Sequence, residues 1–398
     1  MIKIEISKTL QNKIRKGYPW IFSYQIQNQV PEGKPEPLAV VYDHKNRFLA
    51  LGLWDPDSDL CFRVLSLGKS QEINNAFLLE RLQAAIKIRE ELKSQGTTGY
   101  RVVNGENDRF PGLVLDRYED TLVLKLYTAS WFPFLDELCE IFQKEFKSQQ
   151  VVLRLARNVA SSLQANSIYR DGQILYGHDK SGWVQFKENG LNFMADVIEG
   201  QKTGFFLDQR DNRLKIKKMA KGLSVLNVFS YSGGFSVYAL AGGCKSVMEV
   251  DYNKFALETS LQNIKLNFPD KIFSTEDFIQ KEGDAFKILS QLKSEKRFFD
   301  VVILDPPAFA RKKKHKAMAL DAYASLAKAG AQLTSGMLYT ASCSAHVPAD
   351  EFYEAVYLGV RSAGKKFEEI ARTGHAPDHP ATFSEAFYLK SAYIKIRP

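Results

Sequence analysis

The chain has 398 residues, of which 45% are hydrophobic and 25% are charged. These values are typical of a soluble folded protein rather than a disordered or membrane-embedded chain, and the length predicts two or three domains. The net charge of +8 and the pI near 9.0 favour polyanions as partners, although charge alone does not separate nucleic acid from acidic lipid.

No targeting or membrane segment is apparent in the sequence. The amino terminus lacks an apolar signal-peptide core, and no run approaches the roughly 20 apolar residues of a membrane span. We therefore expect a cytoplasmic protein without a membrane partner. The four cysteines lie far apart and show none of the CxxC spacings typical of zinc or redox sites, so we predict neither a disulfide framework nor a metal site.

Residues 1–68 are predicted to form a small β-rich domain, because short apolar runs alternate with turn residues. Its early segment 13–22 places Lys13, Arg15 and Lys16 beside a glycine, a proline and aromatic residues, a mix suited to phosphate contact and stacking. The segment resembles the start of a PUA domain, an RNA-binding barrel. We predict phosphate contacts for the three cations, with a solvated basic turn as the alternative, and a core position for Trp20.

Residues 72–180 are predicted to form a mixed α+β middle domain to which we assign no chemistry. Apolar residues recur at helical spacing first, and strand-like runs separated by turn residues follow. The expected elements are a helix over 75–93, strands over 100–104, 113–115 and 121–127, a helix over 134–147 and a strand over 151–155.

A third domain is predicted over 183–398, and it begins with a hairpin. Two strand-like runs, 183–186 and 191–197, flank Asn189-Gly190, which is a strong hairpin signal. The polar loop and charged helix of 202–213 follow. Gln209 in this segment is a candidate for contact with a cofactor, although helix capping and surface charge account for much of the same pattern.

The next segments predict a nucleoside site in a doubly wound sheet. A strand over 223–229 turns through glycines into a helix over 235–241, and Asp251 ends the next strand, about 20 residues later, at the spacing of an acid that binds ribose hydroxyls. The turn lacks the G-x-G-x-x-G of a dinucleotide dehydrogenase, and S-adenosyl-L-methionine (SAM), which has no phosphate, suits it better. The predicted cofactor-binding residues here are Phe229, Ser230, Tyr231, Ser232, Gly233, Gly234 and Asp251.

Two further acidic residues are expected just after the carboxyl ends of strands in this sheet. Asp284, followed by Ala285, is placed to accept the adenine amino group, with helix capping as a nearly equal alternative. The apolar run 298–304 reads as a central strand that ends at Asp305 and two prolines, because proline cannot continue a sheet ladder. We assign Asp305 to both catalysis and cofactor binding, because open α/β sheets bind ligands at strand carboxyl ends.

The Asp305-Pro-Pro-Ala-Phe309 sequence resembles the fourth motif of class I SAM methyltransferases that act on nucleic acid bases. The resemblance implies that the Asp305 carboxylate forms a hydrogen bond with the edge of a base and that Phe309 stacks on the base. The densest basic run follows it. We predict contacts with RNA phosphates for four of its members, with a solvated face as an equal alternative: Arg311, Lys312, Lys313 and Lys314.

Cys343 follows another apolar strand, which we expect beside the Asp305 strand. A lone cysteine is most often a small buried apolar residue, but this position favours a function. An ordinary thiol with a pKa near ~8.5 is only slightly ionised at neutral pH, so the site must activate it, and His346 is one candidate.

Taken together, the chain resembles the family of PUA-containing large-subunit rRNA cytosine methyltransferases over essentially its whole length. The motifs that carry the resemblance are Lys-Gly-Tyr-Pro-Trp-Ile-Phe at 16–22, the segments 202–213 and 227–235, Asp305-Pro-Pro-Ala-Phe309, Thr340-Ala-Ser-Cys-Ser344 and Gly374-His-Ala-Pro-Asp-His-Pro380.

The resemblance implies a Rossmann-like SAM methyltransferase domain preceded by the PUA-like and middle domains. It also implies that Cys343 is the nucleophile in forming 5-methylcytosine in large-subunit (23S) rRNA. Another large group of RNA cytosine methyltransferases has a second cysteine where Pro307 stands, so the base that removes the carbon 5 proton is not identified. A homodimer is compatible with the sequence.

Two other function classes stay open. A related methyltransferase group shares the Asp-Pro-Pro-x-Phe motif but methylates guanine without a cysteine nucleophile, and Cys343 argues against it. A non-catalytic RNA-binding assembly factor is disfavoured because the glycine turn, Asp251, Asp305 and Cys343 are all present.

Overall fold

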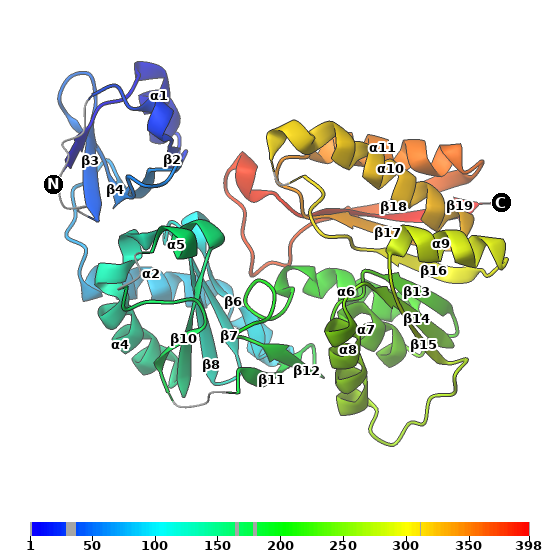
Figure 1. The fold of residues 1–398 in the computed structure, drawn as a ribbon. Coiled ribbons are helices and arrows are strands. Elements are labelled where there is room, and N and C mark those ends of the chain that lie inside the picture. Colours follow the sequence, from blue (N-terminus) through cyan, green and yellow to red (C-terminus); the bar gives the residue numbers. More distant parts are fainter. Residues whose placement is uncertain (1, 29–36, 164–166, 178–180, 311, 398) are drawn as a thin grey trace. The chain divides into compact units, whose positions relative to one another are not determined.

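The structure is a computed structural model that describes residues 2–28, 37–163, 167–177, 181–310 and 312–397. The chain divides into two compact units, whose elements are labelled in Figure 1. The first unit comprises residues 1–188, 195–205 and 377–383, and the second comprises 189–194, 206–376 and 384–398. Within the described residues no helix combines the length and apolar character that crossing a membrane requires.

The amino-terminal part of the first unit is a five-stranded sheet with the strand order β1-β3-β4-β5-β2. Helix α1 begins at Ser7, whose hydroxyl accepts the backbone N–H of Leu10, and it adds Leu10 and Ile14 to the core of this sheet. The small β-rich domain predicted over 1–68 is therefore present. Its elements are β1 (Ile2–Ile4), α1 (Lys8–Arg15), β2 (Trp20–Ile21), η1 (Ser23–Gln25), β3 (Leu38–Tyr42), β4 (Phe48–Trp54) and β5 (Phe62–Leu67).

A second five-stranded sheet in the same unit has the order β10-β9-β8-β7-β6. The helix predicted over 75–93 is divided in two, and Arg89 between the pieces turns inward, where its guanidinium pairs with Asp108. The elements are α2 (Asn75–Ile88), α3 (Glu91–Ser94), β6 (Gly99–Asn104), η2 (Gly105–Asp108), β7 (Leu113–Tyr118), β8 (Thr121–Leu126), η3 (Ala129–Phe134), α4 (Leu135–Phe146), β9 (Gln150–Leu155), α5 (Arg157–Ser162) and β10 (Gln173–Tyr176).

The unit boundaries differ from the three ranges expected from the sequence. Glu106 at the second sheet accepts hydrogen bonds from both Arg63 and Trp20 of the first sheet, so the two sheets belong to one compact unit. Trp20 is half-buried and its indole N–H is used in this contact, which differs from the expected core position. Local sequence patterns do not record such contacts between sheets.

Two short segments from the carboxyl-terminal half also belong to the first unit. The Thr203 hydroxyl donates to the buried Asp116, and the Asp378 carboxylate accepts the backbone N–H of Arg101. The predicted hairpin is formed by β11 (Trp183–Glu188) and β12 (Leu191–Asp196), and Asn189 and Gly190 both have positive φ, as its two-residue turn requires.

The second unit is built on a seven-stranded sheet with the order β15-β14-β13-β16-β17-β19-β18. The five strands from β15 to β17 run parallel, whereas β19 is antiparallel to both of its neighbours. Figure 1 shows α9, α10 and α11 along one face of this sheet and α6, α7 and α8 along the other. Because both faces are covered, the central strands are apolar on both sides, which confirms the doubly wound fold expected from the sequence.

The elements of the second unit follow the predicted alternation of strands and helices. They are η4 (Leu207–Gln209), α6 (Arg210–Met219), β13 (Ser224–Val228), α7 (Gly234–Ala241), β14 (Ser246–Asp251), α8 (Lys254–Asn267), β15 (Phe278–Glu282), α9 (Ala285–Ser294), β16 (Phe299–Leu304), η5 (Lys313–His315), α10 (Lys316–Gln332), β17 (Thr334–Ser342), α11 (Ala349–Ser362), β18 (Lys366–Thr373), η6 (Ser384–Ala386) and β19 (Lys390–Arg397).

Candidate functional site

The predicted site residues of the second unit gather at the carboxyl ends of its parallel strands. Asp251 is the last residue of β14, Asp305 directly follows β16, and Cys343 directly follows β17. Strands β16 and β17 are hydrogen-bonded neighbours in parallel register, as the sequence predicted, so Asp305 and Cys343 both follow strands that end at the same edge of the sheet. This is the edge at which open α/β sheets bind ligands.

The loop after β13 has an unusual backbone. Phe229, Tyr231 and Gly233 have φ values of 62°, 48° and 76°, so three residues within five adopt the left-handed region. Such strain persists where the surroundings hold it, and it is concentrated at ligand sites. Gly233 is required for a second reason: a Cβ there would collide with the hydroxyl oxygen of Ser260 on α8. Gly233 is therefore required by the conformation of the turn and by its close packing against α8.

Asp251 fixes the shape of this loop. Its two carboxylate oxygens accept the backbone N–H groups of Tyr231 and Asn253, each at 2.8 Å. Every carboxylate oxygen has a second lone pair, so the half-buried Asp251 can still accept hydrogen bonds from a pair of ribose hydroxyls. The carboxylate thus fixes the end of the turn after β13 and the start of the loop after β14.

Asp284 lies at the amino terminus of α9 and accepts the backbone N–H of Lys287 at 3.0 Å. The capping role that the sequence left open is therefore present, and the side chain is otherwise exposed, whereas Ala285 is buried. Two exposed aromatic residues lie one or two positions after the predicted cofactor acids: Tyr252 and Phe286 are 81% and 39% exposed. The sequence already indicated Phe286 as an apolar neighbour of Asp284, but it did not single out Tyr252.

The side chain of Gln209 is hydrogen-bonded to Asp305. The Gln209 amide N–H donates to Asp305 Oδ1 at 3.0 Å, and the amide oxygen accepts from Asn212 at 2.6 Å and from the Tyr339 hydroxyl at 3.0 Å. Burial raises the pKa of Tyr339 well above its usual value, so its hydroxyl remains a donor. Gln209 was predicted to contact a cofactor; in the structure it is buried and its amide N–H donates to Asp305.

The loop that carries Cys343 is tied to the loop after Asp305. The Tyr323 hydroxyl of α10 bridges the side chains of Ser342 and Ser344, and the Ser344 hydroxyl accepts the backbone N–H of Ala310 at 3.3 Å. The Cys343 thiol, which is half-buried, lies 4.0 Å from the carbonyl oxygen of Pro306. The thiol is therefore held next to the Asp-Pro-Pro segment.

One cation near this loop was missed by sequence reasoning. Lys390, the first residue of β19, is buried, and its ammonium donates to the carbonyl oxygens of Ser344 and Val347 at 2.5 and 2.6 Å. His346, the residue considered from the sequence as an activator of the thiol, is exposed on the same loop. A lysine at the start of a distant strand carries no local signal of such a role.

The residues after Asp305 that were predicted to contact RNA differ in exposure. Lys312, Lys313 and Lys314 are exposed and make no ion pair with the part of the chain that the structure describes, while Arg311 lies outside the described residues. Phe309 is half-buried and packs on Tyr323 with ring centroids 4.9 Å apart, which leaves part of the ring accessible.

The amino-terminal cations lie on the first unit. Lys13 and Lys16 are exposed, whereas Arg15 pairs with Asp43 at 2.8 Å, and a hydrogen bond from Arg47 holds the pKa of Asp43 well below its usual range. Arg15 is therefore already engaged, which the sequence did not indicate. Arg15, Asp43 and Arg47 help to line a hollow of about 510 Å³ on the small sheet.

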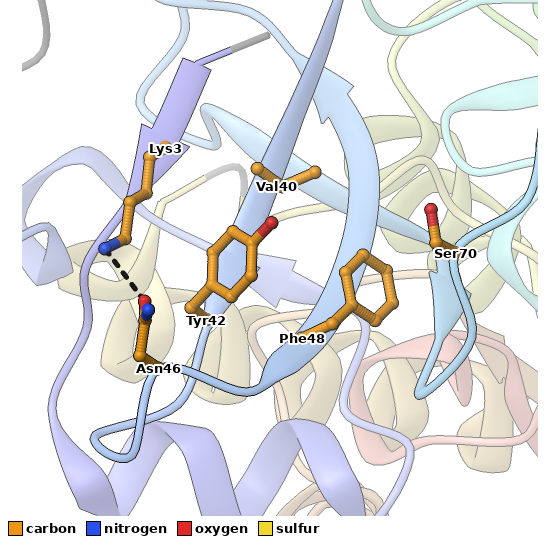
Figure 2. A pocket seen from close by; sticks show the side chains of 6 residues that line it. All are labelled: Lys3, Val40, Tyr42, Asn46, Phe48 and Ser70. Carbon is orange, nitrogen blue, oxygen red and sulfur yellow. Dashed lines mark hydrogen bonds between the residues drawn. The ribbon is translucent and has the colours of Figure 1, made fainter.

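A neighbouring hollow of about 560 Å³ on the small sheet shares Phe48 with the first. Figure 2 shows the rings of Tyr42 and Phe48 beside the hydrogen-bonded pair Lys3 and Asn46. The Lys3 ammonium lies 5.4 Å from the centre of the Tyr42 ring. In the described part of the chain no group of three or more metal-binding side chains is found.

Comparison with known proteins identifies a family for the amino-terminal sheet and a family for the methyltransferase-like sheet of the second unit. Residues 163–351 match a family described as S-adenosylmethionine-dependent methyltransferase, and residues 4–67 match a PUA-like domain. The chain is similar to a protein of Deinococcus radiodurans named ribosomal RNA large subunit methyltransferase, with 43% identity over 99% of this chain and 97% of that one. A Shewanella denitrificans protein named ribosomal RNA large subunit methyltransferase I is 34% identical over 99% of both chains.

The fold is also similar to solved structures. A protein of Streptococcus mutans described as a SAM-dependent methyltransferase has a TM-score of 0.84 at 22% identity, covering 99% of this chain and all of that one. A methyltransferase solved with S-adenosylhomocysteine has a TM-score of 0.85 at 23% identity, with the same coverage. These likenesses confirm the expected fold class.

Proposed function

From the premise that this chain belongs to the family of SAM-dependent large-subunit ribosomal RNA methyltransferases, we propose that it methylates carbon 5 of a cytosine in large-subunit (23S) rRNA in the cytoplasm. The observation that carries the choice of base is that Cys343 and Asp305 follow the carboxyl ends of neighbouring parallel strands. The thiol is the nucleophile that cytosine requires, and the carboxylate is a partner for its ring nitrogen. A homodimer is compatible with this proposal and is not required by it.

The residues around the glycine turn fit SAM. The positive φ values at Phe229, Tyr231 and Gly233 define a tight turn after β13, and Asp251, which accepts the backbone N–H of Tyr231 in this turn, has carboxylate oxygens for ribose hydroxyls. Bound there, SAM supplies the methyl group as an electrophile on its positive sulfur. We propose that Asp284 and Ala285 meet the adenine.

The chemistry explains why a thiol and a carboxylate are needed together. Carbon 5 of cytosine is a poor nucleophile until the Cys343 thiolate adds to carbon 6, which moves the electron pair of the 5,6 double bond to carbon 5. Asp305 hydrogen-bonds or protonates ring nitrogen 3, where negative charge develops. With SAM bound, carbon 5 would then accept its methyl group, and S-adenosylhomocysteine would be the leaving group.

Release of the product reverses the first step. A base removes the carbon 5 proton, the electron pair re-forms the double bond, and the bond between Cys343 and carbon 6 breaks to return the thiolate. Gln209 keeps Asp305 in place throughout, because its amide is itself fixed by Asn212 and Tyr339. The target base must leave its stack to reach this site, at a cost of roughly a few kcal/mol.

The reaction product tests the proposal. Large-subunit rRNA purified from cells that lack the protein should accept a methyl group from SAM when the protein is added, and nucleoside mass spectrometry should find it as 5-methylcytidine. Methylguanosine as the product would assign the chain to the guanine-methylating class. No methyl transfer by protein that binds SAM would instead favour a role in RNA binding without catalysis.

We further propose that the exposed lysines of the basic run bind RNA phosphates, as phosphate contacts release condensed counterions. Changing Lys312, Lys313 and Lys314 to glutamine should make the dependence of log affinity on log salt shallower, by about one unit or less for each lysine that binds a phosphate. Filter binding of rRNA fragments at several salt concentrations measures this slope.

A matched control uses three other exposed lysines of the second unit. Changing Lys287, Lys293 and Lys296, in or next to α9, to glutamine alters net charge by the same amount and should leave the slope nearly unchanged. Equal slopes for the two triple variants would mean that Lys312, Lys313 and Lys314 are solvated surface residues that do not bind RNA phosphates.

A further inference from the structure

Lys390 occupies an unusual position for a lysine. It is only 3% exposed, and in the ladder between β17 and β19 it lies directly opposite Ser342, the residue before Cys343. Directly opposed residues of an antiparallel pair point to the same face of the sheet. The side chain is therefore directed alongside the end of β17, into the loop that carries the thiol.

The hydrogen bonds of Lys390 use only two of the three N–H groups of its ammonium. Two N–H groups donate to the carbonyl oxygens of Ser344 and Val347, which close the loop around Cys343. An ammonium has three N–H donors, and the structure shows no acceptor for the third among the residues it describes. Carbonyl oxygens also leave the positive charge unneutralised, and a buried charge is costly without a counter-charge.

Cys343 and Tyr323 are ionisable side chains at the loop that this ammonium contacts. Cys343 interacts electrostatically with Lys390, and the Tyr323 hydroxyl approaches the same loop through Ser342 and Ser344. Burial raises the pKa of Tyr323, so the phenol stays neutral near neutral pH. The thiol of Cys343 is therefore the group that can supply a negative charge to the buried cation.

We propose that Lys390 is a positioning residue that holds Cys343 as a thiolate and fixes the loop around it. The assignment rests on the proposed function, because it explains how the nucleophile of that reaction is ionised at neutral pH. An adjacent cation stabilises a thiolate by direct charge interaction, as at other reactive cysteines.

The titration of Lys390 itself agrees with this role. Burial lowers the pKa of Lys390 to about 8, and the negative charge of Cys343 acts in the opposite direction. Near pH 7 the ammonium is therefore still mostly charged. Above about pH 8 it loses its proton, but there an ordinary thiol with a pKa near ~8.5 begins to ionise unaided. The contribution of Lys390 is thus expected to be largest between about pH 6 and 8.

The test measures the thiol directly. The rate of Cys343 alkylation by iodoacetamide, followed by peptide mass spectrometry across pH, gives the pKa of this thiol in the complete protein. The other three cysteines are internal references, because burial raises the pKa of each to about 11: Cys61, Cys139 and Cys244. Wild-type Cys343 should titrate below the ordinary ~8.5.

Two substitutions separate charge from loop tethering. Lys390→Gln keeps an N–H donor for the carbonyl oxygens and removes the charge, and Lys390→Met removes both. Each should raise the pKa of Cys343 by about one unit or more, which lowers its alkylation at pH 7 about tenfold. Tyr323→Phe is the matched control, since it removes contacts to the same loop without changing a charge, and it should leave the pKa of Cys343 unchanged.

Methyl transfer supplies an independent readout. Lys390→Gln should lose about tenfold in kcat at pH 7, and the deficit should shrink as the pH approaches 9, because the thiol then ionises without help. Loss of a merely structural contact would not be rescued by pH. An unchanged Cys343 pKa in Lys390→Gln protein that binds S-adenosylhomocysteine normally would overturn the inference.

The outcomes distinguish this inference from the proposed function. If the pKa of Cys343 depends on Lys390 but Cys343→Ala still methylates RNA, then Lys390 does stabilise the thiolate, and the proposed nucleophilic mechanism on cytosine is wrong. If methyl transfer requires Cys343 but its pKa ignores Lys390, the mechanism stands and the inference about Lys390 fails.

Discussion

Replacing Cys343 by alanine is expected to lower methyl transfer by at least about 10³-fold while the protein still folds and binds its cofactor. The thiol is the group that the proposed reaction bonds to carbon 6 of cytosine, and nothing else in that step replaces it. Because the side chain is small and half-buried, its removal should cost no more than roughly 1 kcal/mol of folding free energy.

Three measurements separate this result from a general loss of structure. Methyl incorporation into rRNA reports the chemistry, calorimetry with S-adenosylhomocysteine reports the cofactor site, and thermal unfolding reports the fold. Cys139→Ala is a matched control, because Cys139 is also half-buried but lies in the first unit. That variant should keep nearly full activity.

RNA that carries 5-fluorocytidine at the target position should trap the wild-type protein. After methyl transfer carbon 5 bears fluorine and no proton, so the elimination that breaks the bond to sulfur cannot occur. The adduct should survive denaturing electrophoresis and map to Cys343. Turnover by Cys343→Ala near the wild-type rate, or an adduct on another cysteine, would reject Cys343 as the nucleophile and revive the guanine-methylating alternative.

Replacing Asp251 by alanine is expected to weaken binding of S-adenosylhomocysteine by roughly 100-fold or more. The carboxylate holds the backbone N–H groups of Tyr231 and Asn253, and in the proposed complex it also accepts the ribose hydroxyls. Hydrogen bonds to a charged group contribute roughly 1.5–3 kcal/mol each, so the loss of two alone accounts for this factor. Isothermal titration calorimetry measures the change.

The effect should be confined to the cofactor site. Asp284→Ala is an informative comparison, because this acid caps α9, and its loss should cost about 1 kcal/mol of stability. We expect a smaller loss of affinity from that change, since Asp284 is exposed. Unchanged binding by a folded Asp251→Ala protein, or no binding by the wild type, would show that the cofactor does not bind at this turn.

The sequence by itself determined the features that local chemistry dictates. The apolar run before Asp305 forms a strand because it suits a position with both faces buried, and the two prolines end its ladder. Asn189 and Gly190 form the hairpin turn because both tolerate positive φ. Since parallel strands share a carboxyl edge, placing Asp305 and Cys343 after two such strands was enough to predict that both lie at that edge of the sheet.

Only the tertiary structure decided which side chains serve these residues. Gln209 reaches Asp305 across 96 positions of sequence, and Lys390 reaches the Cys343 loop across more than 40. Arg15, which was predicted to contact RNA phosphates, is an exposed residue that is also paired with Asp43 in the fold. Sequence periodicity records which face of an element is buried. It does not record the long-range contacts through which a glutamine comes to orient a carboxylate or a lysine comes to face a thiol.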